Sequence, residues 1–338
     1  MAGPPLPPAD RSSADLPASG HRFGLEETVS LLVLVWVALA LVAAQLWQVT
    51  APEAPSSTPR APITMPRWVW PLVVLSLGLF SLFASSILGS GRRHWQALWR
   101  RPIDEPGARP HVFLETTVLF LLLSSIVGVV VGELSGPGTL WPLWLQWSLA
   151  MVFLWPVLRA VPTERRRHAL GWSLSPAVPR GPQRGPGRRL AIEAAWGLAA
   201  YVGAWPVLAC AAALSAWLAT HWASAHHPVA DWIRTAAGFD RWTVLMIALV
   251  WAPLMEETLF RGAFFHYLRS RWSVGTAALV SASLFALLHP QGPAGWPFLM
   301  TLGVILALLR HARGSIVAGL TMHCVHNGVT LSLLTSFP

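Results

Sequence analysis

Long apolar segments recur along this chain of 338 residues, and they restrict the folds that it can adopt. The chain is 54% hydrophobic and only 12% charged, whereas a soluble chain of this length would carry about 25% charged residues. A helix needs about 20 mostly apolar residues to cross a hydrocarbon core of ~30 Å, and several runs meet that length. The sequence therefore predicts an all-α fold, a polytopic transmembrane bundle of about eight or nine spans.

Nine segments are candidate spans. In chain order they are residues 28–49, 67–89, 111–132, 140–161, 190–220, 242–268, 273–289, 296–310 and 314–336. The segment 296–310 is short for a span, and 273–289 contains several small residues. The expected architecture is a membrane-embedded bundle joined by short polar loops.

Composition also divides the chain into five parts. Residues 1–27 are polar and rich in Pro, Ala and Ser, which is typical of a disordered tail. The N-terminal spans follow at 28–161, and an Arg-, Pro- and Gly-rich stretch at 162–189 predicts a cytoplasmic loop. A linking span and loop at 190–241 then lead to the late spans at 242–332, where the ionisable residues discussed below are concentrated.

Arginine is distributed unequally between the two sides of this predicted bundle. With the N-terminus in the cytoplasm, nineteen of the 24 arginines lie in the tail and the cytoplasmic loops, four lie opposite, and Arg261 falls within a span. Positively charged loops stay in the cytoplasm, so this orientation is expected. The same bias accounts for the net charge of +9. We therefore expect the lipid bilayer, and not nucleic acid, as a partner.

Three ionisable residues lie close together inside the segment 242–268. They are Glu256, Glu257 and Arg261, in the run Met-Glu-Glu-Thr-Leu-Phe-Arg. An ionisable group within a span is energetically expensive and is a functional hypothesis by default. The alternative is that both acids only brace neighbouring helices against Arg261.

The spacing of these residues predicts a division of roles between the two glutamates. Successive helical residues differ by about 100° in direction, so both cannot face one pocket equally. Glu257 and Arg261 are four residues apart with the acid first, which is the favourable order for an ion pair. Glu256 then remains as the unpaired carboxylate and a candidate general base. Pro253, three residues earlier, is expected to bend the helix.

Two further polar pairs follow in the next spans. Phe285 and His289 are four residues apart and share a helix face, as do His323 and Asn327 in the last segment. An imidazole and a carboxamide together can donate hydrogen bonds to a developing oxyanion. Taken alone, a histidine at the end of an apolar helix is more often interfacial than catalytic, and a His and Asn pair is also typical of interhelical hydrogen bonding in a membrane bundle.

Taken together, Glu-Glu-x-x-x-Arg, Phe-x-x-x-His and His-x-x-x-Asn on successive segments resemble a known family. This is the CPBP (CAAX protease and bacteriocin-processing, or Abi) family of intramembrane endopeptidases, which includes the type II CAAX prenyl endopeptidases. The resemblance covers residues 242–332 and implies a membrane-embedded hydrolase. The earlier spans carry no motif that matches.

The resemblance also implies a role for each motif residue. Glu256 is expected to activate water for attack on a peptide carbonyl, His289 to hold that water, and His323 with Asn327 to stabilise the oxyanion. Glu257, Arg261 and Phe285 are expected to support them. We expect no cofactor, although a zinc-dependent version of the same protease stays open, with Glu256, His289 and His323 as ligands.

Other functions stay open beside this protease. A non-catalytic membrane scaffold or a bacteriocin self-immunity protein would need no hydrolysis, and intramembrane Glu, His and Arg also serve in transporters. The expected substrate is a peptide or protein, membrane-associated, either CAAX-like or a processed bacteriocin. The Ala- and Pro-rich composition with arginine as its basic residue fits a GC-rich bacterial genome, which places the multi-pass chain in the bacterial cell (inner) membrane.

Overall fold

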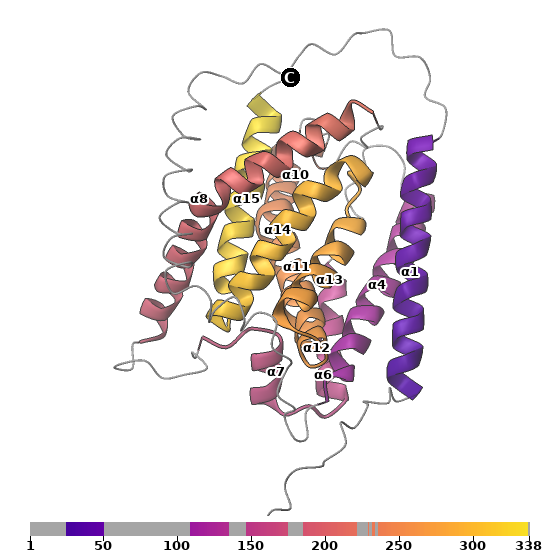
Figure 1. Ribbon diagram of the computed structural model, residues 1–338, viewed down its shortest axis with the longest axis vertical. Coiled ribbons are helices and arrows are strands. Elements are labelled where there is room, and N and C mark those ends of the chain that lie inside the picture. The colour runs from indigo at the N-terminus through magenta and orange to yellow at the C-terminus, as the bar shows by residue number, and fades with distance from the viewer. Residues whose placement is uncertain are drawn as a thin grey trace, which may run out of the picture.

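The computed structural model describes residues 25–50, 109–134, 147–174, 185–221, 229, 232–233 and 236–336. All regular secondary structure in these ranges is helical, so the predicted all-α class is confirmed (Figure 1). The predicted span 67–89 and residues 1–24 of the predicted tail lie outside the described ranges. Leu25, Glu26 and Glu27, also assigned to that tail, already belong to the first helix.

The helices of the first half follow the predicted segments closely. They are α1 (Leu25–Thr50), α4 (His111–Leu134), the 3₁₀-helix η1 (Leu149–Leu154), α6 (Trp155–Leu158), α7 (Thr163–Ala169) and α8 (Pro186–Ala219). Helix α7 lies within the stretch predicted to be a loop. Because its last residue, Ala169, and the following Leu170 are buried, packing orders this part of the Arg-rich segment.

The second half holds the helices of the late segments. They are α10 (Gly238–Met246), η2 (Ile247–Trp251), α11 (Ala252–Glu256), η3 (Glu257–Phe264), α12 (Phe265–Arg269), α13 (Val274–Leu287), α14 (Gly292–Arg313) and α15 (Val317–Ser336). The segments from α10 to α12 run on as one long helix. Helix α14 packs along α13 and α8, and α15 packs along α8 (Figure 1).

Four of the described helices are long and apolar enough to cross a membrane. They begin at His111, Pro186, Gly238 and Gly292. Shorter apolar helices occupy Leu149–Leu158 and Val274–Leu287. The chain is therefore an integral membrane bundle, with fewer full-length spans among the described helices than the nine predicted segments.

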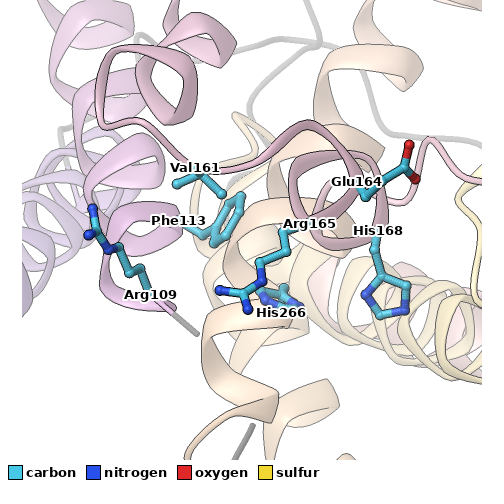
Figure 2. A pocket seen from close by; sticks show the side chains of 7 residues that line it. All are labelled: Arg109, Phe113, Val161, Glu164, Arg165, His168 and His266. Carbon is cyan, nitrogen blue, oxygen red and sulfur yellow. The ribbon is translucent and has the colours of Figure 1, made fainter. Parts of the chain in front are cut away.

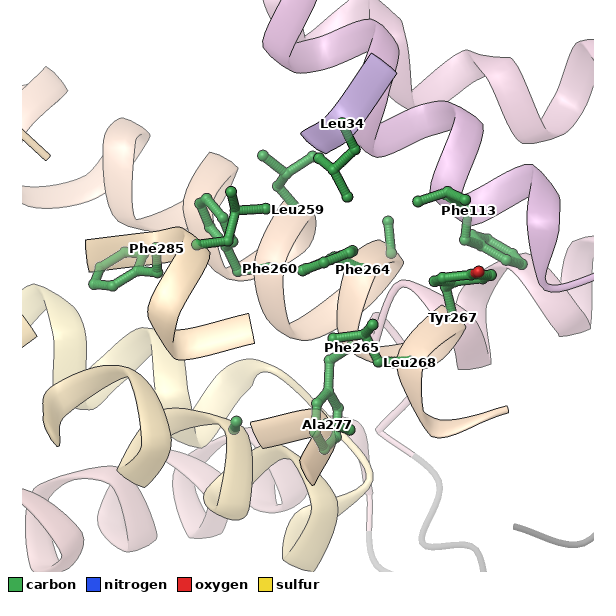
Figure 3. Close-up of a cluster of buried hydrophobic side chains, with 14 of the residues drawn as sticks. Leu34, Phe113, Leu259, Phe260, Phe264, Phe265, Tyr267, Leu268, Ala277 and Phe285 are labelled. Carbon is green, nitrogen blue, oxygen red and sulfur yellow. The ribbon is translucent and has the colours of Figure 1, made fainter. Parts of the chain in front are cut away.

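A hydrophobic core joins the early helices to the helix that carries the glutamates. Leu34 of α1 and Phe113 of α4 belong to the same buried cluster as Leu259, Phe264 and residues of α13 (Figure 3). Polar contacts reinforce this junction at one end. Glu27 accepts hydrogen bonds from the Tyr267 hydroxyl at 2.9 Å and from Arg271 at 2.7 Å. The helix that carries the glutamates is thus held on several sides.

Candidate active site

The helix that carries the glutamates switches from α-helical to π-helical hydrogen bonding at two places. The segments η2 and η3 are π-helical, and the five residues of α11 between them are α-helical. Pro253 stands in the first turn of α11 and has no backbone N–H to donate, which weakens a regular α-helical ladder there. Glu256 is the last residue before the second π-helical segment. Such π-turns are frequent at functional sites.

Glu256 faces two imidazoles, His323 from α15 and His289 from the turn that follows α13, where the helix ends at Leu287 and not at the predicted residue 289. Its Oε2 atom lies 3.6 Å from His323 Nε2 and 3.9 Å from His289 Nε2. Both distances are longer than a direct hydrogen bond. Oε2 has no hydrogen-bond partner among the described residues, although the side chain is 28% exposed. The three predicted residues therefore meet around one buried carboxylate oxygen.

The other nitrogen of each imidazole fixes the direction of the ring. His289 Nδ1 lies 2.6 Å from the Phe285 carbonyl oxygen, and His323 Nδ1 lies 3.0 Å from Glu257 Oε1. A carbonyl or a carboxylate can only accept, so each Nδ1 carries the proton and donates. In a neutral ring Nε2 then carries a lone pair. Both lone pairs are on the side of Glu256.

Glu257 and Arg261 form the ion pair that their spacing predicts. Arg261 Nη1 lies 3.1 Å from Glu257 Oε1, with both side chains almost fully buried. The Arg261 guanidinium also stacks over the Phe285 ring at 4.3 Å. Because Glu257 Oε1 binds His323 as well, it connects the buried arginine to the imidazole that faces Glu256. Glu257 therefore orients His323 as well as balancing the charge of Arg261.

Asn327 is placed one helical turn beyond His323 on α15. Its Nδ2 atom donates to the Ala248 carbonyl oxygen at 2.9 Å, within the π-helical segment η2. This bond ties α15 to the helix of Glu256. Among the described residues, this is the hydrogen bond that the Asn327 side chain makes. The carboxamide has a second amide proton, which can be donated to another acceptor.

Gly319 was not singled out from the sequence, yet it borders the buried ion pair. A Cβ atom there would lie 2.8 Å from Glu257 Oε2, which is closer than real Cβ contacts. Small residues let membrane helices approach one another closely. The stretch Gly319-Leu-Thr-Met-His323 places this glycine one turn before the histidine, which is the signal that could have identified it.

We expect Gly319→Ala to destabilise the protein by about 1–3 kcal/mol, because overpacking of a filled interior costs this much. The matched control is Gly328→Ala on the same helix, where the nearest atom to a Cβ would be Leu249 Cδ2 at 3.9 Å. Thermal unfolding of the purified variants measures both effects. Equal melting temperatures for the two variants would show that Gly319 is not constrained by Glu257.

Glu256, His289 and His323 are the three residues that could hold a zinc ion. Their chemistry fits, since imidazole and carboxylate are zinc ligands and each Nδ1–H has an acceptor. Their spacing does not. Among the described side chains, one trio has ligand atoms within 4.8 Å of one another, and it is Glu26, His111 and Glu115. Glu256 Oε2 is close to the Nε2 atoms of both imidazoles, yet these three atoms do not form such a trio, so the two Nε2 atoms lie more than 4.8 Å apart. This is too far for both to bind one metal ion at ~2.1 Å.

Comparison with known proteins agrees with the motifs. Residues 238–329 match the family model described as "Type II CAAX prenyl endopeptidase Rce1-like". This range contains all seven predicted site residues, so the resemblance stated from the three motifs is confirmed for this part of the chain.

One curated relative is similar to part of the chain. It is an Escherichia coli protein described as "Uncharacterized 24.3 kDa protein", 34% identical over 98 residues. The aligned part is 27% of this chain and 42% of that protein, so less than half of the relative is covered. No solved structure matches the chain.

Proposed function

We propose that this protein is an intramembrane endopeptidase in which Glu256 acts as the general base on water. One observation carries the proposal. Glu256 Oε2 is an unpartnered carboxylate oxygen with two imidazole Nε2 atoms at 3.6 and 3.9 Å. A water molecule that donates one proton to this oxygen and one to an imidazole has its lone pairs free for a carbonyl carbon.

The proposed reaction has two steps. As the water oxygen bonds to the peptide carbonyl carbon, its proton passes to Glu256 and the carbonyl oxygen becomes an oxyanion. The protonated Glu256 then gives this proton to the leaving nitrogen while the C–N bond breaks. The products are a new carboxyl group and a new amine, and Glu256 returns to its starting state.

His323 and Asn327 can stabilise the oxyanion in the proposed reaction. An imidazolium at His323 would donate from Nε2, and the carboxamide of Asn327 has a second amide proton for the same oxygen. Glu257 and Arg261 hold the His323 ring in place from its other side.

The substrate in this proposal is a peptide or protein that reaches the site from the membrane. The Rce1-like match and the bundle of apolar helices support a membrane-associated substrate. Both a CAAX-like substrate and a processed bacteriocin peptide fit this class. The proposed location is the bacterial inner membrane with the N-terminus in the cytoplasm.

Hydrolysis in ¹⁸O-labelled water tests the activity itself. The purified chain, reconstituted in vesicles, would be incubated with a library of apolar peptides and the products analysed by mass spectrometry. We expect new C-termini that carry one ¹⁸O atom, because water supplies that oxygen. Unchanged peptides, together with full biological function of the Glu256→Gln and His289→Ala variants, would support the non-catalytic scaffold or immunity function instead.

We expect the activity to survive removal of zinc. The imidazole spacing suits a hydrogen-bonded water better than a shared metal ion. The measurement compares turnover before and after dialysis against a strong chelator, with the zinc content of the protein determined in parallel. Loss of turnover on dialysis and recovery on addition of zinc would establish the metal-dependent version of the protease.

A further inference from the structure

Five consecutive residues at and after the end of α7 contact both helices that carry the site. We call residues 168–172 the post-α7 segment. At its start, the His168 ring lies 6.3 Å from the His266 ring of α12, measured between ring centroids (Figure 2). The segment belongs to the stretch predicted to be a loop, yet Leu170 and Gly171 are buried. It is therefore part of the packed bundle.

Two contacts join the post-α7 segment to the helix of Glu256. The indole Nε1 of Trp172 donates to Thr258 Oγ1 at 3.2 Å, and Thr258 is fully buried. A Cβ atom at Gly262 would lie 2.7 Å from the Leu170 carbonyl oxygen, so the two backbones are in direct contact. Thr258 and Gly262 are four residues apart and share one face of the helix. The segment thus supports one face of η3 along a full turn.

Two further bonds join the same segment to the start of α15, the helix of His323. The Gly171 carbonyl oxygen accepts from the Ile316 backbone N–H at 3.0 Å and from the Ser315 hydroxyl at 3.3 Å. Gly171 has a φ of 74°, and a Cβ atom there would lie 2.6 Å from Ile316 Cγ2. Glycine suits this position because it adopts a positive φ without steric cost. The post-α7 segment therefore bridges the two helices that carry Glu256 and His323.

The contact at Thr258 lies on the face of the helix that is turned away from Glu256. Two residues on a helix differ by about 200° in direction, at about 100° per residue. Trp172 therefore supports the helix from behind the reacting atoms. A shift of the helix at this point would change the distances from Glu256 Oε2 to the two imidazoles, which are 3.6 and 3.9 Å. A misplacement of ~1 Å can lower a reaction rate by about 10²-fold.

We propose that Trp172 is a positioning residue that acts through Thr258 to fix Glu256 relative to His323. This inference rests on the proposed function, because it assigns Trp172 a part in the same hydrolysis. The bond fixes the reacting groups and not the substrate. Its loss is therefore expected to lower kcat and to leave KM almost unchanged.

Steady-state hydrolysis by the reconstituted full chain tests the proposal, with an apolar peptide from the ¹⁸O assay as substrate. Trp172→Phe keeps an aromatic ring but removes the N–H donor, and Thr258→Val removes the acceptor. We expect each to lower kcat about tenfold and to leave KM within about twofold. Thr258→Ser keeps the hydroxyl and should keep kcat within about threefold of the original. The double variant Trp172→Phe with Thr258→Val should be about as slow as either single variant, because both remove the same bond.

Trp155→Phe is the matched control. Trp155 Nε1 donates to Glu115 Oε2 at 2.7 Å, which is an indole bond between α6 and α4 and not to the helix of Glu256. This variant should keep kcat within about twofold. Hydrogen–deuterium exchange of residues 257–264 gives a second measurement that needs no hydrolysis. Exchange there should be at least about threefold faster in Trp172→Phe than in the unsubstituted chain or in Trp155→Phe, because local opening follows the loss of a local contact.

The two measurements distinguish failure of this inference from failure of the proposed function. If the unsubstituted chain hydrolyses peptides, an unchanged kcat in Trp172→Phe would overturn the positioning role. Equal losses in Trp172→Phe and Trp155→Phe, or additive losses in the double variant, would overturn it as well. A lack of hydrolysis by the unsubstituted chain would overturn the proposed function instead, and unchanged exchange at 257–264 would then show that Trp172 does not hold this helix.

Discussion

Glu256→Gln is expected to abolish peptide hydrolysis while the protein still folds and inserts. The amide has nearly the shape of the carboxylate, but it cannot take a proton from water. Loss of a general acid–base group costs about 10²–10⁴-fold in rate. Because Glu256 serves in both proposed steps, we expect a fall of at least about 10³-fold. Turnover of a peptide substrate by the reconstituted variant measures it.

The fold should be kept because Glu256 Oε2 has no hydrogen-bond partner to lose among the described residues. The melting temperature of the variant checks this point. Glu26→Gln is the control for removal of a carboxylate, since Glu26 lies on α1 and its side chain is 64% exposed. A Glu256→Gln variant with more than a tenth of the original turnover would rule out Glu256 as the base.

The largest effect on stability is expected from Arg261→Gln. The variant leaves Glu257 as a buried carboxylate without its cation, and breaking such a pair costs about 3–5 kcal/mol. It also removes the stacking of the guanidinium on Phe285. Unfolding in mixed micelles of increasing denaturing detergent measures the loss. Activity should fall as well, because Glu257 orients His323.

Two further variants distinguish the effect of breaking the buried Glu257–Arg261 ion pair from the effect of removing any charged group. Glu26→Gln breaks the ion pair between Glu26 and Arg159, whose side chains are 64% and 34% exposed, and should cost at most about 1 kcal/mol. The double variant Glu257→Gln with Arg261→Gln removes both charges and should be more stable than Arg261→Gln alone. A double variant that is less stable than either single variant would contradict the buried ion pair.

Most of the site could be predicted because its chemistry is expressed in residue types and spacing. Buried acids, an arginine four residues on and three later polar residues stand out in apolar segments, where each is expensive. The four-residue spacing of Glu257 and Arg261 is sufficient to predict their ion pair, which the structure contains. The all-α fold class could be predicted in the same way, from the length of the apolar segments.

The remaining features depend on long-range contacts that spacing does not encode. The two π-helical segments around α11 are one such feature, because hydrogen-bond register cannot be read from residue periodicity. The contact of His323 with both glutamates depends on how α15 packs against η3. Helix α7 was missed because its arginines and flanking prolines suggest a loop, whereas burial of Leu170 against Gly262 orders it.

An experimental map of the site, at a resolution that shows ordered water, would show directly whether Glu256 holds a water molecule. We expect one oxygen-sized peak within about 3 Å of Glu256 Oε2 and of an imidazole Nε2. Data collected at the zinc absorption edge should show no signal at that peak. A metal at about 2.0–2.2 Å from Glu256, His289 and His323 would contradict the proposed role of Glu256, as would side chains that point to different faces of the bundle.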